Sequence, residues 1–318
     1  MEASQRLQLR NALFPVEITE VYVKMREVDT LFDTGRRTVV KADRFRAVVD
    51  TERAYVFSVV APDYRLVTNA EAVDLGRACF SKVFKITKAE EMEFYNLIMP
   101  GTRSFCHIDF LHQGTQLEPF DKDVWQPYLR VSNSYNRTLA LNFDIGFCRG
   151  ICKNGVIFGK RNIVFKFVHS RRATDPQVEF SLRAGELQDL EKRFVESLFN
   201  LQRFHVPRRV MWALACRVFG VTIPPNPTPR QSELLDAKAA HVSRLTLAYF
   251  DQLGENGYAA LNVLTDFASR PSGMISPEAS VDTLQRKAGA WIEEFVLANE
   301  SRSFSFDQFL GPYAGLVA

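Results

Sequence analysis

YLRVSNSYNRTLALNFDIGFC, residues 128–148, carries the clearest strand pattern in the chain. In its second half apolar and polar residues alternate, which is the two-residue period of a strand that is buried on one face. One face holds Leu139, Leu141, Phe143, Ile145 and Phe147, and the other holds Asn142, Asp144 and Cys148. A shorter apolar run at 129–131 precedes this strand, and Ser134 and Asn136 between the two are typical of turns. The stretch predicts an antiparallel β-hairpin.

A second turn signal follows this hairpin. Asn154 and Gly155 form the dipeptide that is most typical of two-residue hairpin turns. Beyond it, Ile163, Phe165 and Phe167 alternate with their neighbours and indicate another strand. We therefore expect a small antiparallel meander that ends near residue 168.

Four strands and two helices are predicted before this meander. The strands are expected at 16–25, 45–49, 55–60 and 104–111, and the helices at 69–83 and 89–99. Thr68 and Glu71 have the spacing of a capping box, in which each side chain bonds the backbone of the other at a helix start. The acidic segment 112–127 is expected to be a long loop.

After residue 168 the sequence changes to a helical period. Apolar residues recur at three- and four-residue spacing from 185 to 204, which predicts the strongest helix in the chain. Further helices are expected at 207–219, 231–253, 256–269 and 279–298. The polar segment 170–177 is the predicted linker between a domain at 1–172 and a domain at 173–318. The predicted fold class is α+β: an antiparallel β-rich N-terminal part with helices, followed by an all-α C-terminal part.

Four blocks of the sequence carry a resemblance to a known family. They are AYVFSVVAPDYRLVTNAEA at 54–72, VSNSYNRTLAL at 131–141, ICKNGVI at 151–157 and YAALNVLTDFA at 258–268. Together they resemble the phage- and plasmid-borne family catalogued as domain of unknown function 932. The resemblance implies an origin in a prophage or another mobile element. The family has no established activity, so the resemblance brings no site residues to this chain.

Positive charge is concentrated between residues 137 and 172. This segment holds eight Lys and Arg residues and one carboxylate, Asp144. Aromatic residues interleaved with cations on a sheet are typical of proteins that bind single-stranded nucleic acid. The predicted nucleic-acid-binding residues are Arg130, Tyr135, Arg137, Lys160, Arg161, Arg171 and Arg172. The alternative interpretation is that these cations are solvated strand and turn ends and that the aromatic residues pack across strands.

The sequence gives little support to metal or acid–base chemistry. The one set of Cys and His able to supply four zinc ligands is Cys106, His107, His112, Cys148 and Cys152, and its spacing is unlike that of zinc sites. His107 and Asp109 share one face of their strand and could form a general base with an orienting carboxylate, but a structural pair is expected. There is no phosphate-binding loop, nucleophile elbow or dinucleotide fingerprint. We expect no metal and no cofactor.

Cysteine usage and hydropathy indicate where the chain works. No apolar run approaches the roughly 18 residues that a membrane span needs, so no membrane partner is expected. The five cysteines are scattered and odd in number, unlike a disulfide framework. We therefore expect a cytoplasmic protein with reduced thiols.

These observations predict a nucleic-acid-binding accessory protein of a phage, prophage or plasmid, with single-strand DNA binding or annealing as its activity. The alternative is a protein–protein interaction module that acts on a host defence or replication complex without catalysis. A nuclease or hydrolase built on His107 and Asp109 ranks last. Cations that line one groove would favour nucleic-acid binding, whereas an exposed apolar patch would favour the interaction module. The sequence predicts no particular oligomeric state.

Overall fold

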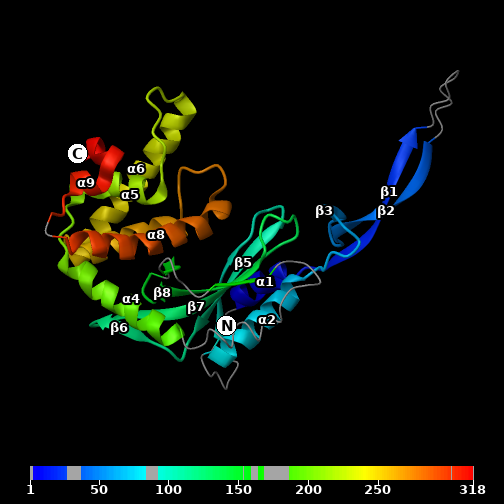
Figure 1. The fold of residues 1–318 in the computed structure, drawn as a ribbon, viewed down its shortest axis with the longest axis horizontal. Coiled ribbons are helices and arrows are strands. Elements are labelled where there is room, and N and C mark those ends of the chain that lie inside the picture. The colour runs from blue at the N-terminus through cyan, green and yellow to red at the C-terminus, as the bar shows by residue number, and fades with distance from the viewer. Residues whose placement is uncertain are drawn as a thin grey trace.

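The chain forms a seven-stranded antiparallel sheet with helices on both faces, a smaller three-stranded sheet and a helical C-terminal part (Figure 1). The computed structural model describes residues 3–26, 37–83, 92–152, 154–158, 164–167, 186–301 and 303–317. This arrangement confirms the predicted α+β class, with the β-rich part first and the helical part second.

The larger sheet contains every strand after residue 91 in the described ranges. Its strands are β4 (Met92–Ile98), β5 (Phe105–His112), β6 (Leu117–Phe120), β7 (Asp123–Ser134), β8 (Leu141–Arg149), β9 (Gly155–Val156) and β10 (Val164–Phe167). The order is β10-β8-β7-β5-β4, while β6 pairs with β7 and β9 pairs with β8. All these pairings are antiparallel.

The predicted hairpin is confirmed as β7 and β8. Leu129 lies opposite Ile145 and Val131 lies opposite Phe143. The alternating residues from Leu141 onward are buried on one face, whereas Leu139 lies before the strand and is half-buried. The hydroxyl of Ser134 closes the turn, because it donates to the carbonyl of Leu139 at 2.8 Å and accepts from its amide at 3.0 Å.

Helices α1 (Ala3–Ala12) and α2 (Asn69–Val83) lie against β4 and β7, and α2 covers the apolar face of the sheet. The approach is close at Gly76, where an added Cβ would lie 2.7 Å from a methyl carbon of Val131. The predicted capping box is present at the start of α2: the amide of Thr68 donates to Glu71 at 2.8 Å, and the amide of Glu71 donates back to the Thr68 hydroxyl at 3.2 Å.

The smaller sheet is built from β1 (Val16–Arg26), β2 (Arg37–Asp50) and β3 (Tyr55–Val60), in that order. We call these three strands the arm. Its base packs on the body through a separate buried cluster that contains Val16, Val48, Val60 and Tyr135. Beyond that base, β1 and β2 extend away from the rest of the molecule (Figure 1).

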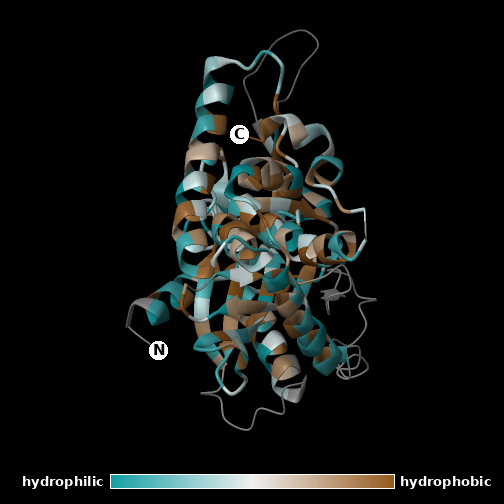
Figure 2. Cartoon of the chain, turned by 90° about the vertical axis from the view of Figure 1, so that its left-hand side faces the viewer, coloured by the Kyte–Doolittle hydropathy of each residue, from teal (hydrophilic) through white to brown (hydrophobic). Residues whose placement is uncertain are grey.

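The C-terminal part is helical, as predicted. Its elements are α4 (Glu186–Arg203), the 3-10 helix η2 (Arg208–Val210), α5 (Met211–Phe219), α6 (Pro229–Leu253), α7 (Gly257–Ser269), α8 (Pro277–Asn299), α9 (Phe306–Leu310) and the 3-10 helix η3 (Gly311–Leu316). Gly220 ends α5 with a left-handed φ of 65°, a conformation that costs glycine little. Nearly all of α7 is buried, from Gly257 to Ala268. Figure 2 shows hydrophobic residues gathered in the middle of this part and hydrophilic turns on its outside.

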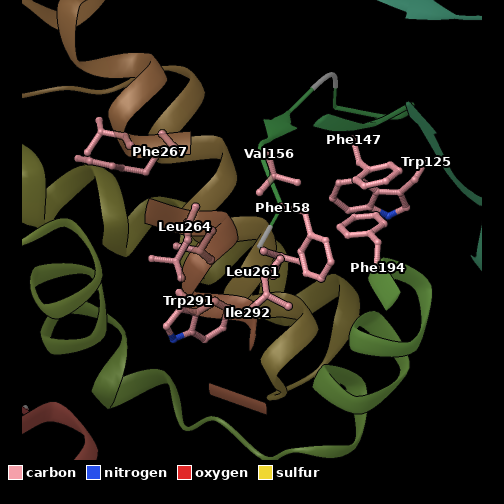
Figure 3. Close-up of a cluster of buried hydrophobic side chains, with 14 of the residues drawn as sticks. Trp125, Phe147, Val156, Phe158, Phe194, Leu261, Leu264, Phe267, Trp291 and Ile292 are labelled. Carbon is pink, nitrogen blue, oxygen red and sulfur yellow. The ribbon is translucent and has the colours of Figure 1, made fainter. Parts of the chain in front are cut away.

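One apolar cluster joins the sheet to the helical part. Phe147 on β8 stacks on Phe194 of α4 with ring centroids 4.1 Å apart, and Trp125 of β7 packs edge-on to Phe194 at 5.2 Å (Figure 3). The same cluster continues through α7 and α8. The predicted division into domains at 1–172 and 173–318 stays a prediction, because its boundary and the linker at 170–177 lie outside the described residues.

Two predictions in the first half were wrong. The helix expected at 89–99 is the strand β4, whose residues Met92, Phe94 and Ile98 are buried, and it pairs with β5. Apolar spacing over so short a segment fits both periods, and the edge of β5 provides backbone partners for a strand. The loop expected at 112–127 contains β6 and the first residues of β7.

The close approach of α8 to the chain after β9 gives a test of this packing. A Cβ added at Gly289 would overlap the carbonyl oxygen of Ile157, so Gly289→Ala must move α8 away from the chain at Ile157. We expect a net loss of about 1–3 kcal/mol in the free energy of unfolding, measured by urea denaturation. Gly315→Ala is the matched control, since a Cβ there meets nothing within 4 Å. Equal midpoints for both variants would contradict the described packing.

Candidate functional site

A network of buried charges lies between the sheet and helix α8. Its members are Asp109 on β5, Arg130 on β7, Asp144 on β8, and Asp282 and Arg286 on α8; we call it the α8 charge network. The three strand residues project from the face opposite α2, because they alternate with the apolar residues that α2 covers. The polar positions of the predicted alternating strand thus face α8.

Arg130 is the centre of this network. Its side chain is fully buried and donates to both oxygens of Asp109, from Nε at 2.7 Å and from Nη2 at 2.8 Å. Its remaining terminal nitrogen, Nη1, donates to Asp282 of α8 at 3.0 Å. Arg286 completes the network, since its Nη1 lies 3.2 Å from Asp144 and its Nε lies 2.8 Å from Asp282. A buried guanidinium with this many partners is held in one orientation.

The charges also set the protonation of Asp282. Burial alone would raise the pKa of this carboxyl, but Arg130 and Arg286 together hold it well below its usual range. Asp282 therefore stays ionised and keeps both of its bridges at any physiological pH.

His107 borders the network and is buried beside it. Its Nδ1 lies 2.7 Å from the hydroxyl of Ser132. Burial, and after it the charge of Arg130, lower the pKa of His107 to about 4, so the ring is neutral at pH 7. Both oxygens of Asp109 are occupied by Arg130. The geometry therefore does not build the His107 and Asp109 acid–base pair that a hydrolase would need.

A second buried network holds the other end of the sheet. Arg149 donates to Asp123 through Nε and Nη2, each at 2.7 Å, and to Asn262 of α7 at 2.9 Å. The hydroxyl of Tyr258 on α7 donates to Asp123 at 2.5 Å and accepts from the indole nitrogen of Trp125 at 3.0 Å. Tyr258 and Asn262 belong to one of the sequence blocks that resemble the family, so that block supplies contacts between helix and sheet.

The structure separates the residues predicted to bind nucleic acid. Arg130 is buried in the α8 charge network. Tyr135 is buried beneath the arm, where its hydroxyl accepts from the amide of Asn69 at 2.8 Å and its ring stacks on Phe57 at 5.2 Å. This corrects the prediction for Arg130 and Tyr135: both side chains are buried and cannot contact a nucleic acid at the surface. Arg137 is exposed on the turn between β7 and β8.

The other predicted contacts are Lys160, Arg161, Arg171 and Arg172, and they lie outside the described residues. The sequence did not identify the partners of the buried arginines and carboxylates. Asp282 binds Arg130, Asp123 binds Arg149 and Arg286 binds Asp144, and the two members of each pair are far apart in the chain. The usable signal was a charged residue in an apolar strand, Asp144, but nothing in the sequence indicated that its partner is Arg286.

Metal ligands do not gather in the described part of the chain. No group of three or more His, Cys, Asp or Glu residues is placed there to hold an ion. Cys106, Cys148 and Cys216 are buried and Cys152 is half-buried, and none of these four described cysteines forms a disulfide.

Among the residues that the structure describes, the arm carries more than half of the exposed large apolar side chains. Its exposed large apolar residues are Ile18, Tyr22, Val23, Met25, Val39, Val40, Phe45, Tyr55, Val56 and Val59. Tyr22 and Met25 have 58% and 54% of their surface exposed. Charges of both signs lie among them, including Glu20, Lys24 and Lys41. The arm is thus a solvent-facing apolar surface with a mixed-charge border.

These features define an α+β protein in which a helical part is fixed to an antiparallel sheet by buried ion pairs. A family model described as "Domain of unknown function (DUF932)" matches residues 56–291, and the chain belongs to this family. The resemblance seen in the sequence is therefore confirmed, whereas the phage or plasmid origin stays a prediction. No curated protein and no solved structure matches the chain. Among the helices that the structure describes, none is long and apolar enough to cross a membrane.

The environment of His107 predicts how stability depends on pH. Because the folded pKa of about 4 lies below the ordinary 6.5, the unfolded chain binds more protons between these values, and stability falls as the pH drops from 6.5 towards 4. His107→Asn should remove up to about 3 kcal/mol of this loss, measured by denaturant unfolding across that range. Ser132→Ala is the control, since it removes the hydrogen bond and keeps the titrating ring. The idea fails if wild type and His107→Asn show the same pH dependence.

Proposed function

We propose that this protein is a protein–protein interaction module whose docking surface is the arm. One observation carries the proposal. Of the exposed large apolar side chains in the described ranges, ten lie on the three strands of the arm, and the other seven are spread singly over the rest of the chain. Exposed apolar residues gathered on one element mark sites of protein interaction, whereas single exposed apolar residues are ordinary.

The base of the arm is fixed to the body of the protein. Arg103 donates to Glu52 at 2.9 Å and approaches Asp50 at 3.5 Å, and Arg53 donates to the carbonyl of Gly101 at 2.8 Å. These contacts tie the turn between β2 and β3 to the turn before β5. A docking surface held in this way loses less conformational freedom on binding.

The chemistry of the arm suits a protein partner better than a polyanion. Along β1, two carboxylates, Glu17 and Glu20, accompany two cations, Lys24 and Arg26. On the surface, Glu20 pairs with Lys41 and accepts from the hydroxyl of Tyr22 at 2.7 Å. Phosphate-binding surfaces need a concentrated excess of positive charge. β1 is balanced, and the three strands of the arm together hold six cations and four carboxylates. The buried networks serve to hold helices on the sheet, and the interaction module acts without catalysis.

The predicted cellular setting agrees with this function. We propose that the protein works in the cytoplasm, because its five cysteines are scattered and odd in number, unlike the disulfide framework of a secreted protein. The partner that we propose for the interaction module is a component of a host defence or replication complex, as the sequence suggested.

Variants of the arm test the proposal. Val23 and Val40 lie opposite each other on β1 and β2 and are 47% and 43% exposed. Val23→Ser with Val40→Ser should weaken any assembly reconstituted from purified components at least tenfold, about 1.4 kcal/mol in binding free energy, because that apolar surface no longer gains from burial. The unfolding midpoint should stay near that of wild type. Binding is measured by titration calorimetry or sedimentation velocity.

The matched control is Ile275→Ser with Leu297→Ser, since these residues are even more exposed but lie outside the arm. The control should bind like wild type. An assembly that survives the arm substitutions unchanged would overturn the proposal.

A second candidate function is binding of single-stranded nucleic acid, and the exposure of Arg137 favours it, since this residue begins the segment with eight cations and one carboxylate. Charge reversal at Lys160, Arg161, Arg171 and Arg172 should weaken binding. It should also flatten the dependence of log affinity on log salt, by roughly 0.7 for each phosphate that the variant no longer neutralises. Fluorescence anisotropy with oligonucleotides at two salt concentrations measures both effects. Wild-type protein without salt-sensitive binding would remove this candidate.

A further inference from the structure

We propose that the arm pairs with the arm of a second copy of this chain, edge to edge and antiparallel through β1, around a two-fold axis at Tyr22. This inference rests on the proposed function, because it names the partner that the arm binds. Three features of the described strands support it: an open strand edge, a charge order along β1 that is complementary to itself, and apolar residues that align in the resulting register.

The open edge is the outer side of β1. In the arm the order is β1-β2-β3, so within the described residues β1 pairs with β2 on one side and with no strand on the other. β1 has 11 residues, without Pro or Gly, which is long for an edge strand. The register irregularity opposite Val21 leaves the extra residues, 42–45, on β2. A long regular edge without a proline or bulge of its own is a template for pairing with another strand.

The charges along β1 are ordered. Its first half carries the carboxylates of Glu17 and Glu20, and its second half carries the cations of Lys24 and Arg26. When two copies of such a strand pair antiparallel, each acidic half meets a basic half. A parallel arrangement would place like charges side by side, which destabilises cross-strand pairs. The antiparallel arrangement is also the one that a two-fold axis generates.

One register satisfies both charge and packing. With Tyr22 opposite Tyr22 of the second copy, Glu20 of each chain lies opposite Lys24 of the other, and Val21 lies opposite Val23. The ε-ammonium of Lys24 has no ion-pair partner among the described residues, so it is available to a second chain. Glu20 already accepts from Lys41 through one oxygen and from Tyr22 through the other, and a carboxylate has room for further donors.

The same register buries apolar surface on the opposite face. Val21, Val23 and Met25 point to one side of β1, with Val40 beside Val23 on β2. In the paired arms these residues from both copies form one apolar stripe across a continuous sheet of two arms. Exposed apolar residues on a projecting ribbon thus gain neighbours that the monomer does not give them.

Charge-reversal variants test the register directly. Lys24→Glu places carboxylates opposite each other in a homodimer, and Glu20→Lys places ammonium groups opposite each other. Each variant alone should dimerise at least tenfold more weakly than wild type in sedimentation equilibrium. An equimolar mixture of the two should recover a dimer containing one chain of each. In that dimer positions 20 and 24 are acidic in one chain and basic in the other, so both contacts between them are attractive. Unfolding midpoints of both variants show that the chains are folded.

A cysteine scan provides the second readout. Opposite residues in antiparallel strands have Cα atoms about 4.5–5.5 Å apart, within the range that a disulfide spans. Tyr22→Cys should therefore form a covalent dimer on mild oxidation, seen on non-reducing gels. Thr38→Cys is the control, since Thr38 is also exposed but lies on β2, away from the pairing edge. It should stay monomeric on the gel.

The outcomes separate this inference from the proposed function. A chain that stays monomeric overturns the inference; if Val23→Ser with Val40→Ser still abolishes binding to a different purified protein, the proposed function stands. A dimer in which the mixture of charge variants fails to recover, or in which Tyr22→Cys does not cross-link, also overturns the inference. A dimer that no arm substitution affects overturns both. Recovery of the mixed dimer together with the Tyr22→Cys cross-link supports both.

Discussion

The rest of the structure depends on the ion pairs and hydrogen bonds of Arg130, whose guanidinium is fully buried. A buried charge is costly unless it is paired and hydrogen-bonded, and here the pairing must come from two sources. Asp109, on the neighbouring strand, fixes Arg130 within the sheet, and Asp282 fixes it to α8. Because α8 is therefore attached at one place on the sheet, the apolar contacts around it can pack in a single arrangement. Because a buried ion pair adds little net stability, we infer that these pairs mainly specify the position of the helical part.

The fold was largely predictable because its signals are local. The alternation from Leu141 to Phe147, the capping box at Thr68 and the helical period after residue 185 each describe one element without reference to any other. The strand β4 was missed because seven residues are too few to separate a helical from an extended period, and the choice was made by pairing with β5.

The sites were less predictable because burial of a cation cannot be read from its own neighbourhood. Arg130 and Tyr135 look like a surface pair in the sequence, yet their partners, Asp282 and the amide of Asn69, are distant in the chain. The arm shows the opposite case. Its segments were predicted only as strands, and the arrangement of β1 and β2 beyond the body shows that many of their apolar residues meet solvent.

The burial of α7 on all sides has a consequence for how the chain is made. Helix α7 is buried around its circumference and is enclosed partly by α8, which follows it in the sequence. During synthesis from the N-terminus, the sheet and α7 leave the ribosome before α8 does. The side of α7 that α8 covers therefore stays exposed, and Arg130 lacks its bond to Asp282, until α8 emerges. Nascent chains that expose apolar surface in this interval are the ones that chaperones bind. Completion of the native state therefore waits for the release of α8 from the ribosome.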